Sequence, residues 1–194
     1  MSNEDRKLFR LALAIIAGVT IVRVLVLIVS PLQLYPDEAQ YWWWAQSPDL
    51  GYFSKPPLIA WVIWLFTSVF GDGEWALRLA SPLFHASTAL LLFAIGRKAF
   101  DARVGFWTSL AYLTLPGVAY SCGLISTDVP LLFCWALALF AFLRALDEPG
   151  WRWPVMCGLA IGFGLLAKYA MAYFILGAVF AAMASPRARK LVLS

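Results

Sequence analysis

Six apolar runs constrain this chain more than any other feature of its sequence. An α-helix needs about 20 mostly apolar residues to cross the hydrocarbon core of a bilayer, and several of the runs have that length. Of the 194 residues, 62% are hydrophobic and only 13% are charged, whereas about 25% of an average soluble domain is charged. We therefore predict an all-α fold, a polytopic transmembrane helix bundle that forms a single domain over residues 1–194. The expected spans cover approximately residues 8–29, 75–95, 104–124, 129–146, 153–168 and 170–184.

Two apolar segments depart from the simple pattern of one run for each span. Residues 153–184 are too long for a single span and contain Lys168, so two short spans with a turn near residues 167–170 are expected. Residues 58–70 are too short to span and suit a helix that lies in the membrane interface. Pro116 falls inside the run 104–124, where it predicts a kink.

The basic residues indicate the orientation of the bundle. Eleven of the fifteen Lys and Arg residues fall on one side of the predicted spans, provided that residues 58–70 do not cross. The positive-inside rule assigns that side to the cytoplasm. We therefore expect a cytoplasmic N-terminus, and an extracytoplasmic loop over residues 31–74 that carries interfacial helices. The eleven residues are Arg6, Lys7, Arg10, Arg97, Lys98, Arg103, Arg144, Arg152, Arg187, Arg189 and Lys190.

Several function classes lack their sequence signals. The chain has no P-loop and no GxGxxG, GxSxG or HExxH motif. Its basic residues lie in short clusters between apolar runs, which argues against a nucleic-acid partner. Cys122, Cys134 and Cys157 show no metal-binding spacing, so no metal ligand is assigned and a divalent-metal requirement stays open. His85 lies alone inside a span, as interior histidines do, and the GxxxG pattern at residues 158–162 predicts helix packing.

Asp37 and Glu38 are the most conspicuous charged residues, because they lie in an aromatic loop directly after the first span. Charges this close to a bilayer are costly and mark functional positions. Adjacent carboxylates point to different faces of a helix or strand, so we expect one to face a reacting group and the other to hold the loop. The simpler alternative is a solvated helix start, with Asp37 as the cap and Glu38 in the first turn.

Lys55 and Asp128 lie on the predicted outer side. Pro56 and Pro57 restrict the backbone after Lys55 and present it at the depth of the lipid headgroups, where phosphates lie. The alternative for Lys55 is an ordinary snorkelling lysine. Asp128 directly precedes the fourth span, and a helix cap is its simpler interpretation, although a cap and a site residue are not exclusive.

Three further cations lie in or near apolar segments. Arg23 is about 10 Å from the outer end of the first span, and we expect it to face the bundle interior with a carboxylate or phosphate partner. Arg78 lies near the outer start of the second span, from which it can snorkel, and Lys168 interrupts the last apolar run. For each of them, a salt bridge that fixes the packing and a role in substrate binding both stay open.

A series of short motifs, taken in order, resembles one protein family. The pattern looks like the N-terminal portion of a bacterial family 39-type glycosyltransferase with the GT-C membrane fold. Relatives are the dolichyl-phosphate-mannose protein mannosyltransferases and the lipid A aminoarabinose transferase. Such proteins have more spans and usually an outer soluble domain, so we expect a fragment of a larger protein. The motifs are Pro-Asp-Glu-Ala-x-Tyr at residues 36–41, Gly-Tyr-Phe-Ser-Lys-Pro-Pro-Leu at 51–58, Gly-Asp-Gly-Glu-Trp-Ala-Leu-Arg at 71–78 and Ser-Thr-Asp-Val-Pro-Leu at 126–131.

The resemblance implies a multi-pass enzyme of the bacterial plasma (inner) membrane. It would move a sugar, with inversion, from a polyprenyl-phosphate-linked donor to a lipid, glycan or protein acceptor on the extracytoplasmic face. The donor, the acceptor and the membrane lipids are its partners, and no cofactor is assigned. The family's lysine at the lipid phosphate corresponds to Lys55. The implied catalytic residues are Asp37, as the base, and Glu38, and the implied substrate-binding residues are Lys55, Asp128, Tyr41, Arg78 and Lys168.

Two other functions remain as alternatives. A membrane transporter or lipid flippase would use the same charges as a substrate path and would depend most on Arg23 and Lys168. Transporters place their sites near the bilayer midplane, whereas the charges of this chain gather on the outer side, which favours the enzyme. The third interpretation is a membrane scaffold without catalytic activity.

Overall fold

The computed structural model describes residues 2–192, and within this range it contains helices and no strands. The predicted all-α fold is therefore confirmed. The elements in chain order are α1 (Asn3–Val29), α2 (Pro36–Ala45), α3 (Leu58–Phe70), α4 (Glu74–Arg78), α5 (Ala80–Ala99), α6 (Ala102–Thr114), α7 (Pro116–Ser121), α8 (Asp128–Asp147), α9 (Arg152–Ala167), the 3-10 turn η1 (Tyr169–Met171), α10 (Ala172–Ala184) and α11 (Pro186–Val192).

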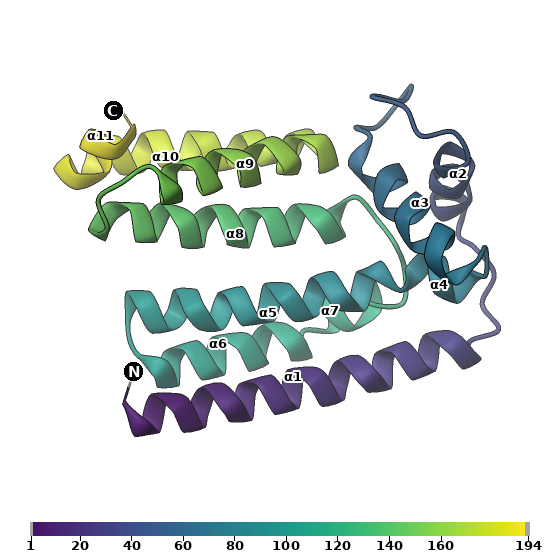
Figure 1. Ribbon diagram of the computed structural model, residues 1–194, viewed down its shortest axis with the longest axis horizontal. Helices are drawn as coiled ribbons and strands as arrows, with labels where there is room; N and C mark the ends of the chain where they lie inside the picture. Colours follow the sequence, from purple (N-terminus) through teal and green to yellow (C-terminus); the bar gives the residue numbers. More distant parts are fainter. Residues whose placement is uncertain (1, 193–194) are drawn as a thin grey trace.

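The long helices lie side by side and give the molecule two distinct ends (Figure 1). Helices α1, α5 and α6 contact one another, α8 packs on α5, and α9 packs on α8. Helices α2, α3 and α4 gather at one end, which we call the loop end. The N-terminus, the α5–α6 and α8–α9 turns and α11 lie at the opposite end, which we call the basic end. The extended linkers on both sides of α2 place that helix beyond the end of the bundle.

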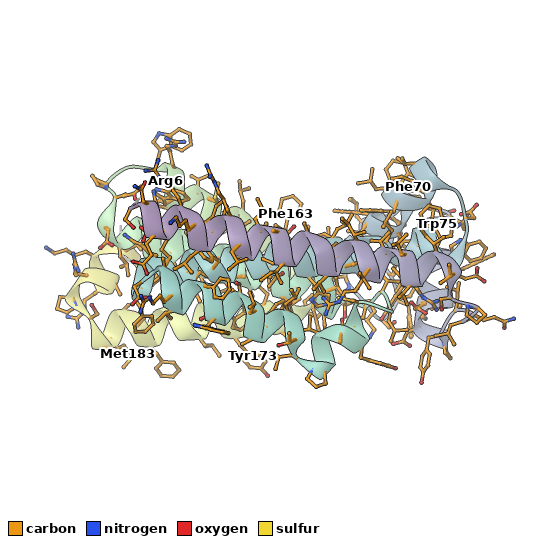
Figure 2. All side chains as sticks on the ribbon, turned by 90° about the horizontal axis from the view of Figure 1, so that it is seen from below. Arg6, Phe70, Trp75, Phe163, Tyr173 and Met183 are labelled. Atoms are coloured by element: carbon orange, nitrogen blue, oxygen red, sulfur yellow. The ribbon has the colours of Figure 1, made fainter. Side chains whose placement is uncertain are left out.

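Three helical segments are long and apolar enough to cross a membrane, namely Asn3–Val29, Glu74–Ala99 and Asp128–Asp147. The segments Leu58–Phe70, Arg152–Ala167 and Tyr169–Ala184 are shorter apolar helices. Large apolar side chains such as Phe163, Tyr173 and Met183 project outward from the bundle, as lipid-facing groups do (Figure 2). The chain is a multi-pass membrane protein, and the exact set of crossing segments stays a prediction.

The predicted span 104–124 contains two helices, because Pro116 separates α6 from α7. Proline lacks an amide hydrogen and keeps the residue before it out of helical geometry, and Leu115 is accordingly extended with ψ 130°. The carbonyls of the last turn of α6 consequently have no helical donor. Arg23 of α1 supplies one, since its Nη2 donates to the Leu113 carbonyl at 2.6 Å. Within residues 2–192 the partner of Arg23 is thus a backbone carbonyl and not the carboxylate that we expected, and a phosphate partner stays a prediction.

Close helix packing occurs at glycines other than the predicted GxxxG pair. A Cβ atom at Gly105 would lie 2.4 Å from the Phe93 carbonyl oxygen, so α5 and α6 can approach this closely only with glycine at that position. A Cβ at Gly158 or Gly162 would meet no atom within 4 Å in the described chain. The packing contact that we expected at residues 158–162 is therefore not made within residues 2–192.

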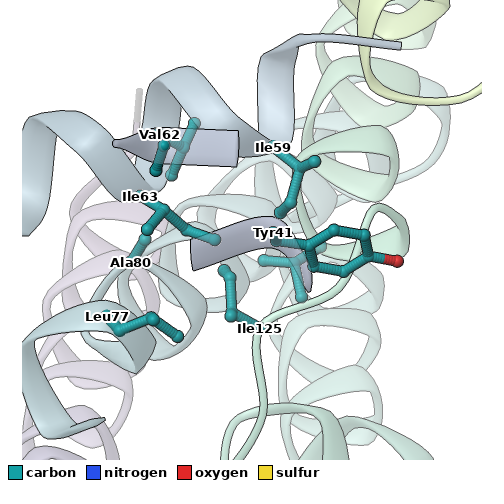
Figure 3. Packing of buried hydrophobic residues seen from close by; sticks show 9 residues of the cluster. Tyr41, Ile59, Val62, Ile63, Leu77, Ala80 and Ile125 are labelled. Atoms are coloured by element: carbon teal, nitrogen blue, oxygen red, sulfur yellow. The ribbon is translucent and has the colours of Figure 1, made fainter. Parts of the chain in front are cut away.

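A hydrophobic core at the loop end connects the outer helices to the bundle. The Tyr41 ring of α2 lies beside Ile59 of α3 and Ile125 of the α7–α8 connection (Figure 3). Leu58 packs against this core and also against a second one between α8, α9 and α10. The start of α3 thus contacts both cores. The buried members of the first core are Tyr41, Ala45, Ile59, Val62, Ile63, Leu77, Ala80, Ile125 and Val129.

Candidate active site

Asp37 and Glu38 begin α2 and point into different environments. Pro36 is at the first helical position, where the missing amide hydrogen costs nothing, and Tyr35 before it is extended. Carboxylates in the first turn are favoured by the helix dipole. The Asp37 side chain is exposed, whereas Glu38 is only 2% exposed. The expected division of the pair, one residue facing outward and one turned into the fold, is present in the structure.

Glu38 forms a buried ion pair with Arg78. Each of the two carboxylate oxygens of Glu38 accepts two hydrogen bonds from donors of the protein. Oε1 accepts from Arg78 Nε at 3.0 Å and from the Ile125 amide at 2.9 Å. Oε2 accepts from Arg78 Nη2 at 2.7 Å and from the Tyr35 amide at 2.9 Å. A buried carboxylate is tolerated only with such complete pairing. Glu38 therefore joins α2, α4 and the α7–α8 connection.

The remaining donors of Arg78 bind the linker between α1 and α2. Nη1 donates to the Leu32 carbonyl at 2.9 Å, and Nη2 donates to the Gln33 carbonyl at 2.8 Å. The residue is 2% exposed, so it does not snorkel to the surface. Arg78 and Glu38 thus hold the linker and the start of α2 in one conformation.

Asp37 lies next to Tyr41, one helical turn further along α2. The Tyr41 hydroxyl donates to Asp37 Oδ2 over a long 3.5 Å. Burial of the ring, followed by the negative charges of Asp37 and Asp128, raises the pKa of Tyr41 to about 12. The hydroxyl is therefore neutral at physiological pH and can act as a hydrogen-bond donor. Val129, which follows Asp128 in α8, belongs to the same hydrophobic core as Tyr41, so the start of α8 lies next to α2.

Asp128 pairs with Lys168 across the ends of α8 and α9. Lys168 Nζ lies 2.7 Å from Asp128 Oδ1, with 41% of the lysine and 54% of the aspartate side chain exposed. Lys168 is placed there because α9 ends at Ala167 and the backbone of Lys168 is extended before η1. The N-cap of α8 is Thr127, without a side-chain cap bond. Asp128 is therefore not the helix cap that the simpler interpretation assumed.

Lys55 lies on an ordered loop and has no hydrogen bond or ion pair within the described part of the chain. Tyr52 stacks on Trp44 with ring centroids 4.7 Å apart, and its hydroxyl donates to the Trp44 carbonyl at 3.1 Å. The Trp61 indole donates to the Asp49 carbonyl at 2.9 Å, which ties the loop to α3. The structure shows no direct interaction between Lys55 and Asp37 or Asp128 in residues 2–192.

The structure therefore brings together two groups of predicted residues. Asp37 with the buried Tyr41, and Asp128 with Lys168, are two polar pairs at the loop end, where α2 meets the start of α8. The buried pair of Glu38 and Arg78 holds the start of α2 beside them. Sequence reasoning missed the Ile125 amide, since a backbone donor carries no sequence signal. No group of three His, Cys, Asp or Glu side chains suited to a metal ion occurs within residues 2–192.

Comparison with known proteins places the chain in a family. Residues 54–194 match the family described as dolichyl-phosphate-mannose-protein mannosyltransferase. The chain is 40% identical to the lipid A galacturonosyltransferase RgtD of Rhizobium johnstonii over 93% of its own length and 38% of that protein. It is 30% identical to the undecaprenyl phosphate-alpha-4-amino-4-deoxy-L-arabinose arabinosyl transferase 2 of Pseudomonas fluorescens, over 86% of this chain and 33% of that protein.

The fold resembles a solved structure as well. ArnT from Cupriavidus metallidurans in the apo state superposes with a TM-score of 0.76 at 24% sequence identity, covering 93% of this chain and 38% of ArnT. The chain thus spans less than two fifths of each of these proteins. The resemblance inferred from the short motifs is confirmed. The chain belongs to the dolichyl-phosphate-mannose-protein mannosyltransferase family and has the helical membrane fold of ArnT.

Proposed function

We propose that this chain forms part of a membrane glycosyltransferase that takes a sugar from a polyprenyl-phosphate-linked donor. The names of its relatives, which transfer galacturonic acid or aminoarabinose, support this reaction class. One observation on this chain itself supports the proposal most directly. Of the two adjacent carboxylates at the loop end, Asp37 is exposed beside a neutral tyrosine hydroxyl, while Glu38 is buried and fully paired.

The proposed acceptor is a lipid on the extracytoplasmic face of the bacterial inner membrane. Two relatives are named for lipid A and for the lipopolysaccharide core. The excess of Lys and Arg at the basic end orients that end toward the cytoplasm under the positive-inside rule. The loop end, with Asp37, then lies outside, where a lipid-linked donor and a lipid acceptor can meet.

Asp37 is the proposed general base. It removes the proton from an acceptor hydroxyl as the oxygen attacks the anomeric carbon, and the bond from that carbon to the phosphate oxygen breaks on the opposite face. The product has the inverted anomeric configuration, the polyprenyl phosphate departs with the electron pair of the broken bond, and the acceptor proton is held by the Asp37 carboxylate. Glu38 is unsuited to this role, because its carboxylate already accepts four hydrogen bonds. We assign Glu38 and Arg78 the role of positioning residues.

Lys55 is proposed to bind the departing phosphate. A cation stabilises the negative charge that develops on the leaving group, and Lys55 is a partly exposed cation without an ion-pair partner in residues 2–192. Tyr41 is proposed to donate from the wall of the same site. Asp128 and Lys168, which are exposed and paired with each other, are proposed to contact the sugar.

Replacing Asp37 with asparagine tests the proposal. The variant keeps the size of the side chain but cannot accept a proton, so transfer should fall by a factor of about 100 or more. The measurement is transfer of labelled galacturonic acid or aminoarabinose from its polyprenyl phosphate to lipid A, with the intact protein in membrane vesicles.

Asp49→Asn is the matched control, because Asp49 is an exposed carboxylate of the same outer segment that contacts only its local turn. It should retain the activity of the unmodified protein. Asp37→Asn protein that inserts normally and transfers sugar at the original rate would rule out Asp37 as the base. If the unmodified protein transfers sugar from neither polyprenyl-phosphate donor, that result would count against the proposed class of donor.

A further inference from the structure

The basic end contains a second group of charged side chains, on the opposite side of the bundle from the candidate active site (Figure 1). A cavity of about 230 Å3 between α5 and α8 is lined by two apolar and three cationic residues. The cations lie in the last turns of the two helices. The lining residues are Ala94, Arg97, Lys98, Phe140 and Arg144.

Arg144 is held in a fixed orientation at this cavity. Its Nη2 lies 2.7 Å from Glu148 Oε1, and Glu148 Oε2 accepts from the Trp153 indole at 2.7 Å. The guanidinium carbon lies 4.7 Å from the centroid of the Trp153 ring. Arg144 Nε is nevertheless buried without a hydrogen-bond partner among the described residues. An unpaired buried donor on a cation is costly and indicates a missing acceptor.

The other two cations keep donors available. Arg97 Nε lies 3.8 Å from Asp5, which is too long for a hydrogen bond. Lys98 Nζ pairs with Asp147 Oδ2 at 2.5 Å and uses one of its three hydrogens for that bond. The acceptors Asp5, Asp147 and Glu148 that face these cations are not among the residues lining the cavity.

The basic end as a whole has an excess of positive charge. Its eleven Lys and Arg residues exceed its acidic residues in number, so the three ion pairs at the cavity do not neutralise the field of this end. The dipoles of α5 and α8 favour cations at their C-termini, which accounts for basic residues there. The helix dipoles do not explain why these basic residues surround a cavity, or why Arg144 Nε is buried there without a partner among the described residues. The acidic residues are Glu4, Asp5, Asp101, Asp147 and Glu148.

We propose that this cavity binds the phosphate of an anionic phospholipid headgroup. Guanidinium groups present paired donors that match phosphate oxygens, and basic pockets between transmembrane helices bind such headgroups. Ala94 and Phe140 precede Arg97 and Arg144 by one helical turn, toward the centre of the bundle. The polar part of the cavity thus lies at the helix ends and the apolar part lies deeper, as the headgroup and acyl chains of a lipid require. The site does not depend on the proposed transfer reaction.

Lipid retention by the purified intact protein tests this site. The protein is equilibrated with equal amounts of phosphatidylglycerol and phosphatidylcholine of the same chain length, and bound lipids are counted by native mass spectrometry. Phosphatidylglycerol should be retained preferentially. Arg97→Gln and Arg144→Gln should each weaken its retention about tenfold, because each removes charged hydrogen bonds to the phosphate.

Arg103→Gln is the matched control, since Arg103 lies at the same end but pairs with Glu4 at 3.0 Å outside the cavity. Equal retention of the two lipids, or an equal loss in Arg103→Gln, would overturn the proposal. If Arg144→Gln unfolds, Arg97→Gln still tests the site, because Arg97 is exposed and its replacement leaves no buried group unpaired. Displacement of phosphatidylglycerol by inorganic phosphate would support recognition of the phosphate alone, and retained lipid under that competition would support recognition of the whole headgroup.

Discussion

Two ion pairs at the loop end, Glu38–Arg78 and Asp128–Lys168, use similar chemistry in opposite environments. Each joins residues 40 positions apart in the sequence at 2.7 Å. The Glu38 and Arg78 side chains are 2% and 3% exposed, whereas those of Asp128 and Lys168 are 54% and 41% exposed. In the first pair the Glu38 carboxylate already accepts four hydrogen bonds from the protein, which is consistent with its proposed positioning role. The second is open to solvent and can exchange its partner for a substrate, so burial separates the roles.

The largest expected difference between the pairs is in stability. Arg78→Met leaves the Glu38 carboxylate buried without its cation, and the free energy of unfolding should fall by about 3–5 kcal/mol. Lys168→Met leaves an exposed aspartate that water can solvate, so its effect should be below about 1 kcal/mol. Denaturant unfolding of the purified protein in detergent measures both values.

A double variant sharpens this test. Glu38→Gln combined with Arg78→Met removes both charges and keeps one acceptor oxygen, which can serve either the Tyr35 or the Ile125 amide. It should recover part of the stability lost in Arg78→Met. Equal stabilities for Arg78→Met and Lys168→Met would show that burial does not distinguish the two pairs.

The second expected difference is in activity. Asp128→Asn should lower sugar transfer about tenfold or more, because a charged hydrogen bond to the proposed substrate is weakened, while unfolding changes by less than about 1 kcal/mol. Asp147→Asn is a suitable control, since Asp147 is an exposed aspartate paired with a lysine at the basic end. Similar transfer rates in Asp128→Asn and unmodified protein would remove Asp128 from the site.

The smallest expected effect concerns Tyr41, which is buried in the hydrophobic core at the loop end. Its pKa of about 12 in the folded protein exceeds the ordinary value of 10.0, so the folded state holds the proton more tightly. The resulting stabilisation is complete below about pH 10 and is lost as the pH rises through 12. Tyr41→Phe should therefore weaken the decrease in melting temperature between pH 10 and 12. Tyr35→Phe, at an exposed tyrosine of the linker before α2, should leave that decrease unchanged, and equal pH profiles in all three proteins would contradict the assignment.

Several features of the fold were predictable because they depend on local patterns. Apolar runs of membrane length predict helices, and Lys168 and Pro116 each mark a position where a helix is interrupted in the structure. The GxxxG prediction failed within the described chain, because glycine spacing alone does not specify which helix approaches. The expected carboxylate partner of Arg23 is not found in residues 2–192, since the break at Pro116 created a carbonyl acceptor that composition does not reveal.

By itself the sequence determined the helical membrane class, the family and the short list of charged residues, because each depends on residue type and spacing along the chain. Only the tertiary structure decided that Glu38 rather than Asp37 turns inward, that Arg78 is its partner and that Asp128 meets Lys168. The physical reason is that these contacts join segments far apart in the sequence. Their burial, and hence the choice between scaffold and candidate site residue, is set by how the helices pack.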